Sequence, residues 1–440
     1  MNELPKRLLI ANHIDPSLLR QPDQRTFTQR IFWLAKEGDL ILVSCEPDAA
    51  FLDHVCANLG IRKELLTIIS VSPDHDEGRI FDPRFLTSHN LIQCLKPLTQ
   101  KCEEVVCLWP SVQVADLVIH LGLEHCFAGT SFFKQGGDAL ANSKASFRAL
   151  AAASAIPIPQ GTVCRTSLEL GDAITELLKV VDGVMVKQSH NGAAAGCTVI
   201  SSSLNSVPRP AGSIWTNDLS EVEDSIPNLW HWASANNRYP VIVEELKIGY
   251  QTIWFEFESK ETGVILRAIG SLEYEKGKML REHTPLKVTI DEEILERAQK
   301  DAYKLAKIYH AIGYRGILSA DGLINDQGTY IFTEMNARIG GSLPIYGGIW
   351  ERVVKQSHDI DRYIVQYLSP PDWPNLKTNL LLQKLDAAGV LYNSVTRIGV
   401  VLGIPPHSEI NQGSFLIILI TKTEKDQKEL FDRVAKRLNP

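Results

Sequence analysis

The sequence lacks several features that would place it in a common class of protein. Its eight cysteines are scattered and contain no C-x-x-C pair, so a zinc site is not expected. No apolar run nears the length that spans a bilayer, and the run Phe415–Ile420 has only the length of a strand. The net charge of −7 over 440 residues shows no positive excess that would suit nucleic acid or an anionic membrane. We therefore expect neither among its partners.

Two further absences concern the N-terminal region. The apolar run that follows Lys6 and Arg7 covers only Leu8–Ile10, which is too short for a signal peptide, so we expect a cytoplasmic protein with reduced, buried thiols. No G-x-G-x-x-G follows this first expected strand, so the fingerprint of a dinucleotide-binding fold is missing. Apolar strands and helical stretches alternate through residues 6–130, which indicates an open α/β sheet with parallel strands.

Length and composition predict a globular protein of two to four domains or subdomains. Hydrophobic residues make up 44% of the chain and charged residues 22%, as in ordinary soluble proteins. Beyond residue 140, pattern and punctuation predict helices at 143–155, 291–311, 350–368 and 424–438, and strands at 184–187, 197–200, 241–245, 252–258, 264–269, 318–324, 330–338, 378–385, 395–402 and 415–420.

The stretch Tyr330–Arg338 is the most informative part of the chain. It begins with an apolar strand pattern and then places Glu334, Asn336 and Arg338 at alternate positions, so the three side chains point to one face. Carboxylate and amide oxygens suit Mg²⁺, which commonly shares its ligands with substrate phosphates. Arginine binds phosphoryl oxygens through its planar fork. The spacing therefore favours a metal-bound phosphate.

A second carboxylate is expected on the same face. Residues 318–324 predict the partner strand of a hairpin that turns at Asn325–Gly328, which brings Asp321 towards the same site. Acidic residues on a polar hairpin face are usually only solvated. The E-x-N-x-R string with an acidic residue on the paired strand is more specific, and we interpret it as a metal–nucleotide site.

Two lysines, far apart in the sequence, fit the same chemistry. Lys187 ends an apolar strand directly before a loop of small residues, whose backbone N–H groups, with Asn191, Gly192 and Gly196, can fold over phosphates. Lys144 lies in the first turn of a capped helix, where a cation is unfavourable for the helix dipole, so another partner is expected. Solvation is the alternative explanation for a loop lysine such as Lys187.

The strand 241–245 ends in paired carboxylates, Glu244 and Glu245, followed by Leu246. Backbone groups of a segment that leaves a buried strand can bind an adenine edge. Two exposed acids are the alternative, and the segment alone does not decide between them.

In this order, the pieces resemble the ATP-grasp superfamily over about residues 100–350. The resemblance is carried by Asn142–Lys144 before a helix that ends in Ile156–Pro159, Val184–Lys187 before the small-residue loop, Val243–Glu245, and Asp321 with Glu334–Arg338. It implies an α/β and α+β multidomain fold with an open parallel α/β pre-ATP-grasp domain at 1–135. Two ATP-grasp subdomains would follow at 136–245 and 246–368, and a small α+β segment at 369–440.

The resemblance also implies roles for individual residues. Lys144 and Lys187 would contact ATP phosphates, and Glu244, Glu245 and Leu246 would line the adenine pocket. Mg²⁺, with Mn²⁺ as an alternative, would be held by Asp321, Glu334 and Asn336. Arg338 would steady the transferring phosphoryl group, together with Arg267 and Lys187.

Two positions depart from the family pattern. The loop Asn191–Gly196 contains three alanines, which restrict positive φ angles. Gln251 stands where many relatives place a glutamate that faces the ribose, so that contact is open.

The resemblance implies a ligase that forms carbon–nitrogen bonds through an acyl phosphate and releases ADP and phosphate. Phe133–Gly137 and the separate C-terminal segment are similar to pheganomycin-type peptide ligases, so amino acids or short peptides are the expected carboxylate and amine, and a homodimer is the default assembly. Arg281 and His283, in an expected polar loop, and Gly340 and Gly341 could contact substrate; a solvated loop explains the first two equally well. A biotin-carboxylase-like carboxylase and a non-catalytic ATP-binding regulator are the alternatives.

Overall fold

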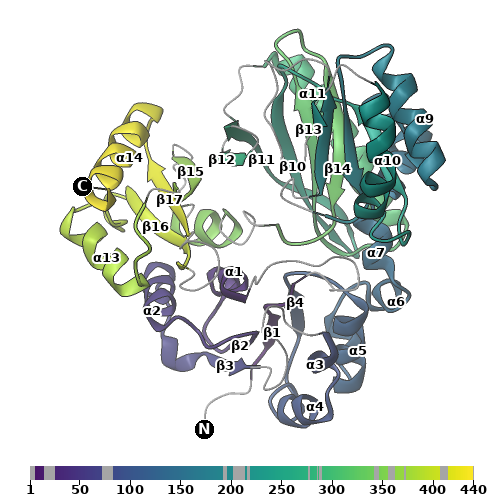
Figure 1. Cartoon of the computed structure of the whole chain (residues 1–440). Helices are drawn as coiled ribbons and strands as arrows, with labels where there is room; N and C mark the ends of the chain where they lie inside the picture. The colour runs from purple at the N-terminus through teal and green to yellow at the C-terminus, as the bar shows by residue number, and fades with distance from the viewer. Residues whose placement is uncertain are drawn as a thin grey trace. The chain divides into compact units, whose positions relative to one another are not determined.

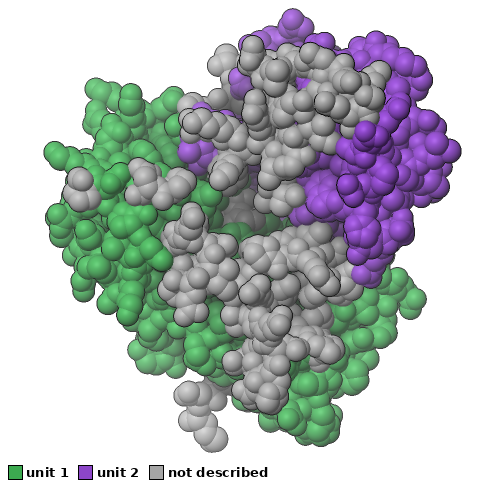
Figure 2. Space-filling view, in the orientation of Figure 1, with its two compact units in different colours: residues 1–136, 281–285, 338–440 green, residues 137–280, 286–337 purple. Residues whose placement is uncertain are grey.

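The computed structural model describes most of the chain and divides it into two compact units (Figure 2). Unit 1 comprises residues 1–136, 281–285 and 338–440, and unit 2 comprises residues 137–280 and 286–337. The described residues are 5–13, 25–71, 83–191, 196–201, 214–215, 219–275, 278–284, 286, 290–340, 346–354, 362–370, 373–406 and 415–439.

Unit 1 begins with the predicted parallel sheet. Its strands are β1 (Arg7–Ile10), β2 (Leu40–Val43), β3 (Thr67–Ser70) and β4 (Glu104–Cys107), in the order β3-β2-β1-β4 (Figure 1). The strands β1 and β2 are almost wholly buried, as their continuous apolar sequence requires. Since β1 lies between β2 and β4, the direction of winding reverses at β1. A parallel α/β sheet binds ligands at the carboxyl ends of the strands beside such a reversal.

Two capped helices follow strands of this sheet, α2 (Ala49–Leu59) after β2 and α5 (Val112–Leu121) after β4. Helix α2 begins at Asp48, whose side chain accepts the Phe51 N–H, and ends at Gly60 in the left-handed region. Helix α5 has the same pattern, with Ser111 at its start and a left-handed Gly122 at its end. Both glycines adopt positive φ angles that other residues tolerate poorly, which explains why both helices end there.

The C-terminal part of unit 1 corrects three of our sequence-based assignments. The helix expected at 350–368 is correct only at its start, because the chain is helical in η4 (Tyr346–Val354) and forms a strand, β15 (Tyr363–Leu368), further on. The expected strand at 378–385 is a helix, α13 (Thr378–Ala387). The strand expected at 395–402 begins later, as β16 (Gly399–Ile404), and pairs with β17 (Leu416–Thr421). Helix α14 (Glu424–Leu438) follows as predicted.

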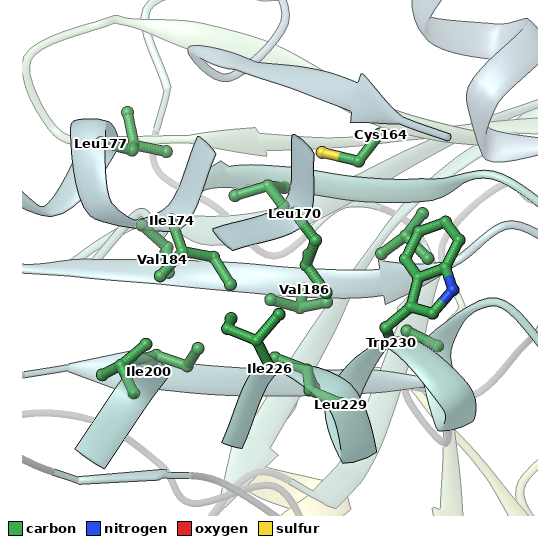
Figure 3. Packing of buried hydrophobic residues seen from close by; sticks show 14 residues of the cluster. Cys164, Leu170, Ile174, Leu177, Val184, Val186, Ile200, Ile226, Leu229 and Trp230 are labelled. Carbon is green, nitrogen blue, oxygen red and sulfur yellow. The ribbon is translucent and has the colours of Figure 1, made fainter. Parts of the chain in front are cut away.

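Unit 2 contains a sheet whose one face is covered by two helices. Its strands, in the order β5-β9-β6-β7-β8, are β5 (Gly161–Cys164), β9 (Val241–Glu245), β6 (Gly183–Gln188), β7 (Cys197–Ser201) and β8 (Ile214–Trp215). Apolar side chains of these strands, such as Val184 and Val186, pack against Leu170 and Ile174 of α9 (Ser167–Leu178) and Ile226 of α10 (Leu219–Ala233) (Figure 3). This core holds β6 and β9 side by side, so polar residues at their ends have fixed positions.

The second antiparallel sheet of unit 2 contains the predicted hairpin. Strands β14 (Tyr330–Asn336), β13 (Gly316–Ile324), β10 (Gln251–Lys260) and β11 (Gly263–Glu275) are neighbours in that order. Helix α11 (Glu292–Ala311) begins at Asp291 as predicted and buries the stripe Ala298, Ala302, Leu305 and Tyr309. Helix α8 (Lys144–Ala153), capped by the Ser143 side chain, also forms as predicted.

The remaining elements are short or lie at the edges of the units. Strand β12 (Lys278–Thr284) begins in unit 2, and its residues 281–284 pair with β15 in unit 1. The others are α1 (Arg25–Thr28), η1 (Gln29–Leu34), η2 (Lys63–Leu65), α3 (Pro83–Leu86), α4 (His89–Leu95), η3 (Glu124–Cys126), α6 (Thr130–Lys134) and α7 (Gly137–Ala141). All eight cysteines are free thiols, and five of them are buried. None of the described helices is both long and apolar enough to cross a bilayer.

Candidate functional site

The hairpin brings the predicted metal ligands together on one face. Asp321 of β13 lies opposite Glu334 of β14, and Ser319 lies opposite Asn336. The Asn336 amide donates to Asp321 Oδ2 at 2.8 Å and to Glu334 Oε1 at 3.2 Å. The Ser319 hydroxyl donates to Asp321 Oδ1 at 2.8 Å. Two carboxylates therefore converge on a single amide group.

This donor set fits a divalent cation that prefers oxygen ligands. A rotation of the Asn336 amide exchanges its nitrogen for its oxygen, which adds a neutral oxygen donor to the carboxylates of Asp321 and Glu334. Mg²⁺ is typically bound by one or two protein carboxylates and completed by substrate phosphates and water. These three residues are therefore sufficient for a metal that arrives with a nucleotide.

Lys144 has the partner that its unfavourable helix position predicted. Its Nζ lies 2.8 Å from Glu334 Oε2 and donates to the carbonyl of Asn191. The side chain is 9% exposed, so the ion pair is largely removed from water. Asn142, the preceding polar residue, donates to the Ala337 carbonyl at 3.2 Å and accepts from the Ala337 N–H at 3.1 Å. The start of α8 is thereby fixed to the end of β14.

Lys187 lies in a second, fully buried ion cluster. Its Nζ pairs with Glu244 Oε1, and Arg148 NH1 of α8 binds Glu244 Oε2 at 2.8 Å. Glu244 is 3% exposed, and Arg148 and Lys187 are each 6% exposed. Burial lowers the pKa of Lys187, but the charges of Glu244 and Glu334 raise it by more than burial lowers it. The pKa is therefore raised overall, and the amine is charged. Arg148 was not predicted, since one arginine in a helix carries no local signal.

The two lysine–glutamate pairs belong to one site. Lys187 acts electrostatically on Glu334 as well as on Glu244. The thiol of Cys197, a residue paired with Lys187 across β6 and β7, interacts with all four charges. Burial raises the pKa of this thiol, the two lysines lower it, and the two glutamates raise it, so that it is raised overall. We call Lys144, Lys187, Glu244, Glu334 and Asp321 the charge cluster of unit 2.

The segment expected to meet adenine is partly engaged within the protein. The Glu245 N–H donates to the Gln160 carbonyl at 2.8 Å, and the Leu246 N–H donates to the Gly183 carbonyl at 2.9 Å. The Glu245 carboxylate pairs with Lys247 at 2.6 Å. Any adenine contact by these two residues therefore falls to their carbonyl oxygens or side chains.

The small-residue loop is described only at its ends, and Gly192 lies outside the described residues. The Gln188 N–H donates to the Gly196 carbonyl at 2.8 Å, and the Asn191 amide donates to Gln188 Oε1 at 2.9 Å. A Cβ at Gly196 would lie 2.4 Å from Asn191 Cβ, so only glycine fits there.

The predicted arginines lie in different surroundings. Arg267 of β11 is 38% exposed in its side chain and pairs with Glu258 at 3.4 Å. Arg338 belongs to unit 1, where its guanidinium lies 4.4 Å from the centre of the Trp109 ring.

The expected polar loop around Arg281 and His283 is wrong, because both residues lie in β12 and pair with Tyr367 and Val365 of β15. His283 is fully buried, and its Nδ1 lies 2.9 Å from the Tyr363 hydroxyl. Arg281 lies over the Tyr367 ring at 5.4 Å. Both have partners in unit 1. Gly340 ends a described segment, and Gly341 lies outside the described residues.

Comparison with known proteins bears on the fold. Residues 28–123 match the family model of the pre-ATP-grasp domain. A search of curated proteins gave no match. Among solved structures, an ADP complex of N5-carboxyaminoimidazole ribonucleotide synthetase is similar, with 12% identity, a TM-score of 0.60, and coverage of 100% of this chain and 99% of that chain. The chain has an ATP-grasp fold. This confirms the fold class expected from the sequence.

Two biotin carboxylases share the ATP-grasp fold. The enzyme from Campylobacter jejuni bound to β-γ-ATP has 13% identity and a TM-score of 0.57, over 99% of this chain and 92% of that chain. The biotin carboxylase domain of Hydrogenobacter thermophilus 2-oxoglutarate carboxylase, a dimer with MgADP and bicarbonate, has 14% identity and a TM-score of 0.59, over 99% and 90%. At these identities, the likeness concerns the fold.

Proposed function

We propose that the protein is an ATP-dependent ligase that joins a carboxylate to an amine. The observation that carries the proposal is the charge cluster of unit 2. Lys144 pairs with Glu334 of the hairpin, Lys187 pairs with Glu244 of β9, and the hairpin offers oxygen donors to a cation. Adenine nucleotides in the solved structures with this fold support ATP as the cosubstrate.

The cluster holds its lysines ready for a triphosphate. Without nucleotide, Lys144 is neutralised by Glu334 and Lys187 by Glu244. A triphosphate would take the lysines as its counter-charges, while Glu334 and Asp321 would turn to the metal. Mg²⁺ bound there would offset phosphate charge and orient the phosphates. Since the cluster is largely buried, each of these interactions is stronger than it would be in water.

The proposed reaction has two steps. A carboxylate oxygen attacks the γ-phosphorus of ATP, the bond to the bridging oxygen breaks, and ADP leaves with an acyl phosphate formed. The amine then attacks the acyl carbon, loses a proton, and phosphate departs from the tetrahedral intermediate to give an amide. The protein supplies position and charge compensation, with Lys187 and Arg267 as candidate contacts to the transferred group. Arg338 is proposed for the same role on its sequence position alone.

We propose amino acids or short peptides as the substrates, as in the pheganomycin-type ligases, and a homodimer as the assembly. A carboxylase is the second candidate, because two structures with this fold are biotin carboxylases and one of them was bound to bicarbonate. Bicarbonate would then be the carboxylate that receives the phosphoryl group. Light scattering of the purified protein tests the dimer.

The decisive experiment is an ATP-dependent phosphate-release screen with mass spectrometry of the products. One arm contains pairs of amino acids and peptides, and the other contains bicarbonate with and without free biotin. Condensation products in the first arm support the ligase. Turnover that needs bicarbonate and rises with biotin supports the carboxylase, and the absence of nucleotide binding contradicts both.

The variant Glu334→Gln tests the site itself. It removes a metal ligand and the partner of Lys144, so we expect the rate of phosphate release to fall by about 100-fold or more. Glu296→Gln is the matched control, because Glu296 lies on the exposed face of α11 and pairs only with Lys300 at 3.7 Å. Circular dichroism verifies that both variants are folded. Equal activity of Glu334→Gln and the control would refute the site.

A further inference from the structure

Unit 1 contains its own group of charged and aromatic residues. His13 follows β1, and Trp109 follows β4. Arg30 comes from η1, and Arg338 lies over the Trp109 ring. We call these four residues the cation cluster. It lies at the carboxyl ends of β1 and β4, where the winding of the sheet reverses, which is where parallel α/β sheets bind ligands.

Arg30 is the unusual member of this cluster. It is only 4% exposed, and it donates to the Phe27 carbonyl at 3.0 Å and to the Ile339 carbonyl at 3.5 Å. Its Nε has no hydrogen-bond partner, and no carboxylate of the described residues forms an ion pair with it. Burial lowers its pKa to about 9, and the nearby charge of Arg338 contributes. A buried cation without an anion is costly, so such a residue is seldom kept for stability.

Other buried cations of the described chain are neutralised, which makes Arg30 stand out. Lys144 pairs with Glu334, and both Lys187 and Arg148 pair with Glu244. In unit 1 itself, Arg7 pairs with Asp39 at 2.6 Å.

The neighbours of Arg30 also have nitrogen atoms that lack partners. His13 stacks on Trp109 with ring centres 5.9 Å apart. His13 Nδ1 and Trp109 Nε1 are buried and form no hydrogen bond with the described residues. Burial, and then the charges of Arg30 and Arg338, lower the pKa of His13 to about 3, so the imidazole is neutral at pH 7. Buried polar atoms without partners are uncommon, and three in one place call for a ligand.

The backbone holds the aromatic member in place. The Asn12 side-chain amide donates to the backbone carbonyl of Trp109 and accepts from the backbone N–H of Trp109 at 3.1 Å. The Ile339 N–H donates to the Leu108 carbonyl at 3.0 Å, which fixes the segment that carries Arg338. The donors are therefore preorganised, and a ligand would lose little free energy in ordering them.

We infer that unit 1 binds the anionic group of a small molecule, a carboxylate or a phosphate, through Arg30, Trp109 and His13. The anion would accept hydrogen bonds from the Arg30 guanidinium and the Trp109 indole N–H, with His13 as a further donor. It would supply the negative charge that Arg30 lacks. This inference stands on unit 1 alone and does not rest on the proposed function.

The test uses the full-length protein without nucleotide. Sodium phosphate and sodium succinate are titrated at constant ionic strength, with sodium chloride as the reference, and binding is followed by calorimetry and by the indole N–H signals in ¹H–¹⁵N spectra. We expect saturable binding of either anion and a shift of one indole N–H signal. That signal should be absent from the spectrum of Trp109→Phe. Stronger binding of succinate identifies a carboxylate site, and stronger binding of phosphate a phosphate site. If both anions act only as chloride does, the inference is overturned.

The variant Arg30→Met tests the site in two ways, because it should weaken anion binding without lowering the melting temperature. Removing the hydrogen bonds of a charged group should weaken anion binding by about 10- to 100-fold. Because it also removes an unpaired buried charge, the variant should melt at the same or a higher temperature than the wild type when no anion is added. Arg62→Gln is the matched control in unit 1, since Arg62 is 71% exposed and pairs with Glu37. Equal weakening in this control would reduce the effect to net charge and contradict the site.

Two further variants complete the design. Trp109→Phe keeps an aromatic ring but replaces the indole and so removes its N–H, and it tests the site if Arg30→Met does not fold. Glu334→Gln, altered in unit 2, should show the same anion-dependent shift of the Trp109 indole signal as the wild type. Failure of the ligase proposal and failure of this inference are therefore distinguishable.

Discussion

The buried carboxylate of Glu244 gives the sharpest prediction about stability. It is 3% exposed and serves two buried cations, Lys187 and Arg148. At an effective dielectric constant of about 20, Coulomb's law gives about 6 kcal/mol for two unit charges 2.8 Å apart, the distance between Glu244 and Arg148. The cost of removing the ions from water cancels much of this gain. Breaking such a network from one side nevertheless leaves an uncompensated charge in the interior.

We expect Glu244→Gln to lower the free energy of unfolding by about 3–5 kcal/mol. Glutamine keeps the shape and one acceptor oxygen, so the loss reports charge rather than packing. The control is Glu176→Gln, which breaks a pair of the same type with Lys179 on the surface of α9, where Glu176 is 71% exposed. That change should cost less than about 1 kcal/mol.

Urea unfolding followed by circular dichroism measures both variants against the wild type. Because the proposed triphosphate would supply negative charge to Lys187, saturating MgATP should stabilise Glu244→Gln more than it stabilises the wild type. The reasoning is refuted if Glu244→Gln unfolds within about 1 kcal/mol of the control at an unchanged urea dependence.

Three other predictions follow from single contacts. Gly196→Ala places a methyl group 2.4 Å from Asn191 Cβ, so the loop must shift, and binding of a fluorescent ATP analogue should weaken by about tenfold or more; unchanged affinity would contradict the role of the loop. Asn142→Ala leaves a buried N–H and C=O at the end of β14 without partners and should cost about 2–3 kcal/mol in urea unfolding, whereas Asn142→Asp should recover part of the loss. Burial lowers the pKa of His54 to about 4, and its Nε2 accepts the Leu402 N–H at 3.0 Å. Its folded pKa lies below the ordinary value, so its contribution is complete above about pH 6.5 and is lost as the pH falls towards 4, with about 2 kcal/mol lost at pH 5. The His54→Gln variant should show a flatter pH dependence between pH 7 and 5, and an identical dependence would refute this assignment.

The sequence predicted the elements whose signals are local. The hairpin has a period-two strand pattern on both sides of a turn that contains Gly328, and the structure confirms it from Gly316 to Asn336. The position of Lys144 at a helix start indicated a partner without saying which, and in the structure Lys144 pairs with Glu334. In both cases the physical reason lies within a few residues of the pattern.

Other features depend on contacts between distant segments. The side chain of Glu244 binds Lys187 and Arg148 only because β9 lies beside β6 and in contact with α8, and no local pattern records this pairing. Arg281 and His283 looked like a polar loop because their partner strand, β15, is about 80 residues further along the chain.

Two errors came from ambiguous composition. The run Thr378–Ala387 is rich in leucine, which we interpreted as a strand, but Leu, Gln and Lys are good helix formers and the segment is α13. The apolar residues of Tyr363–Leu368 also fit a helical period, yet this short run with β-formers is fully paired as β15.

The pairing of each lysine with its own glutamate bears on how a catalytic cycle would end. Glu334 and Glu244 lie within the site and cannot diffuse away, so in the proposed cycle they would compete with spent nucleotide for Lys144 and Lys187. Once the terminal phosphate has gone, ADP carries less charge, and the intramolecular partners regain the advantage. The protein would thus carry an internal means of discharging its product, so that tight capture of ATP need not slow turnover.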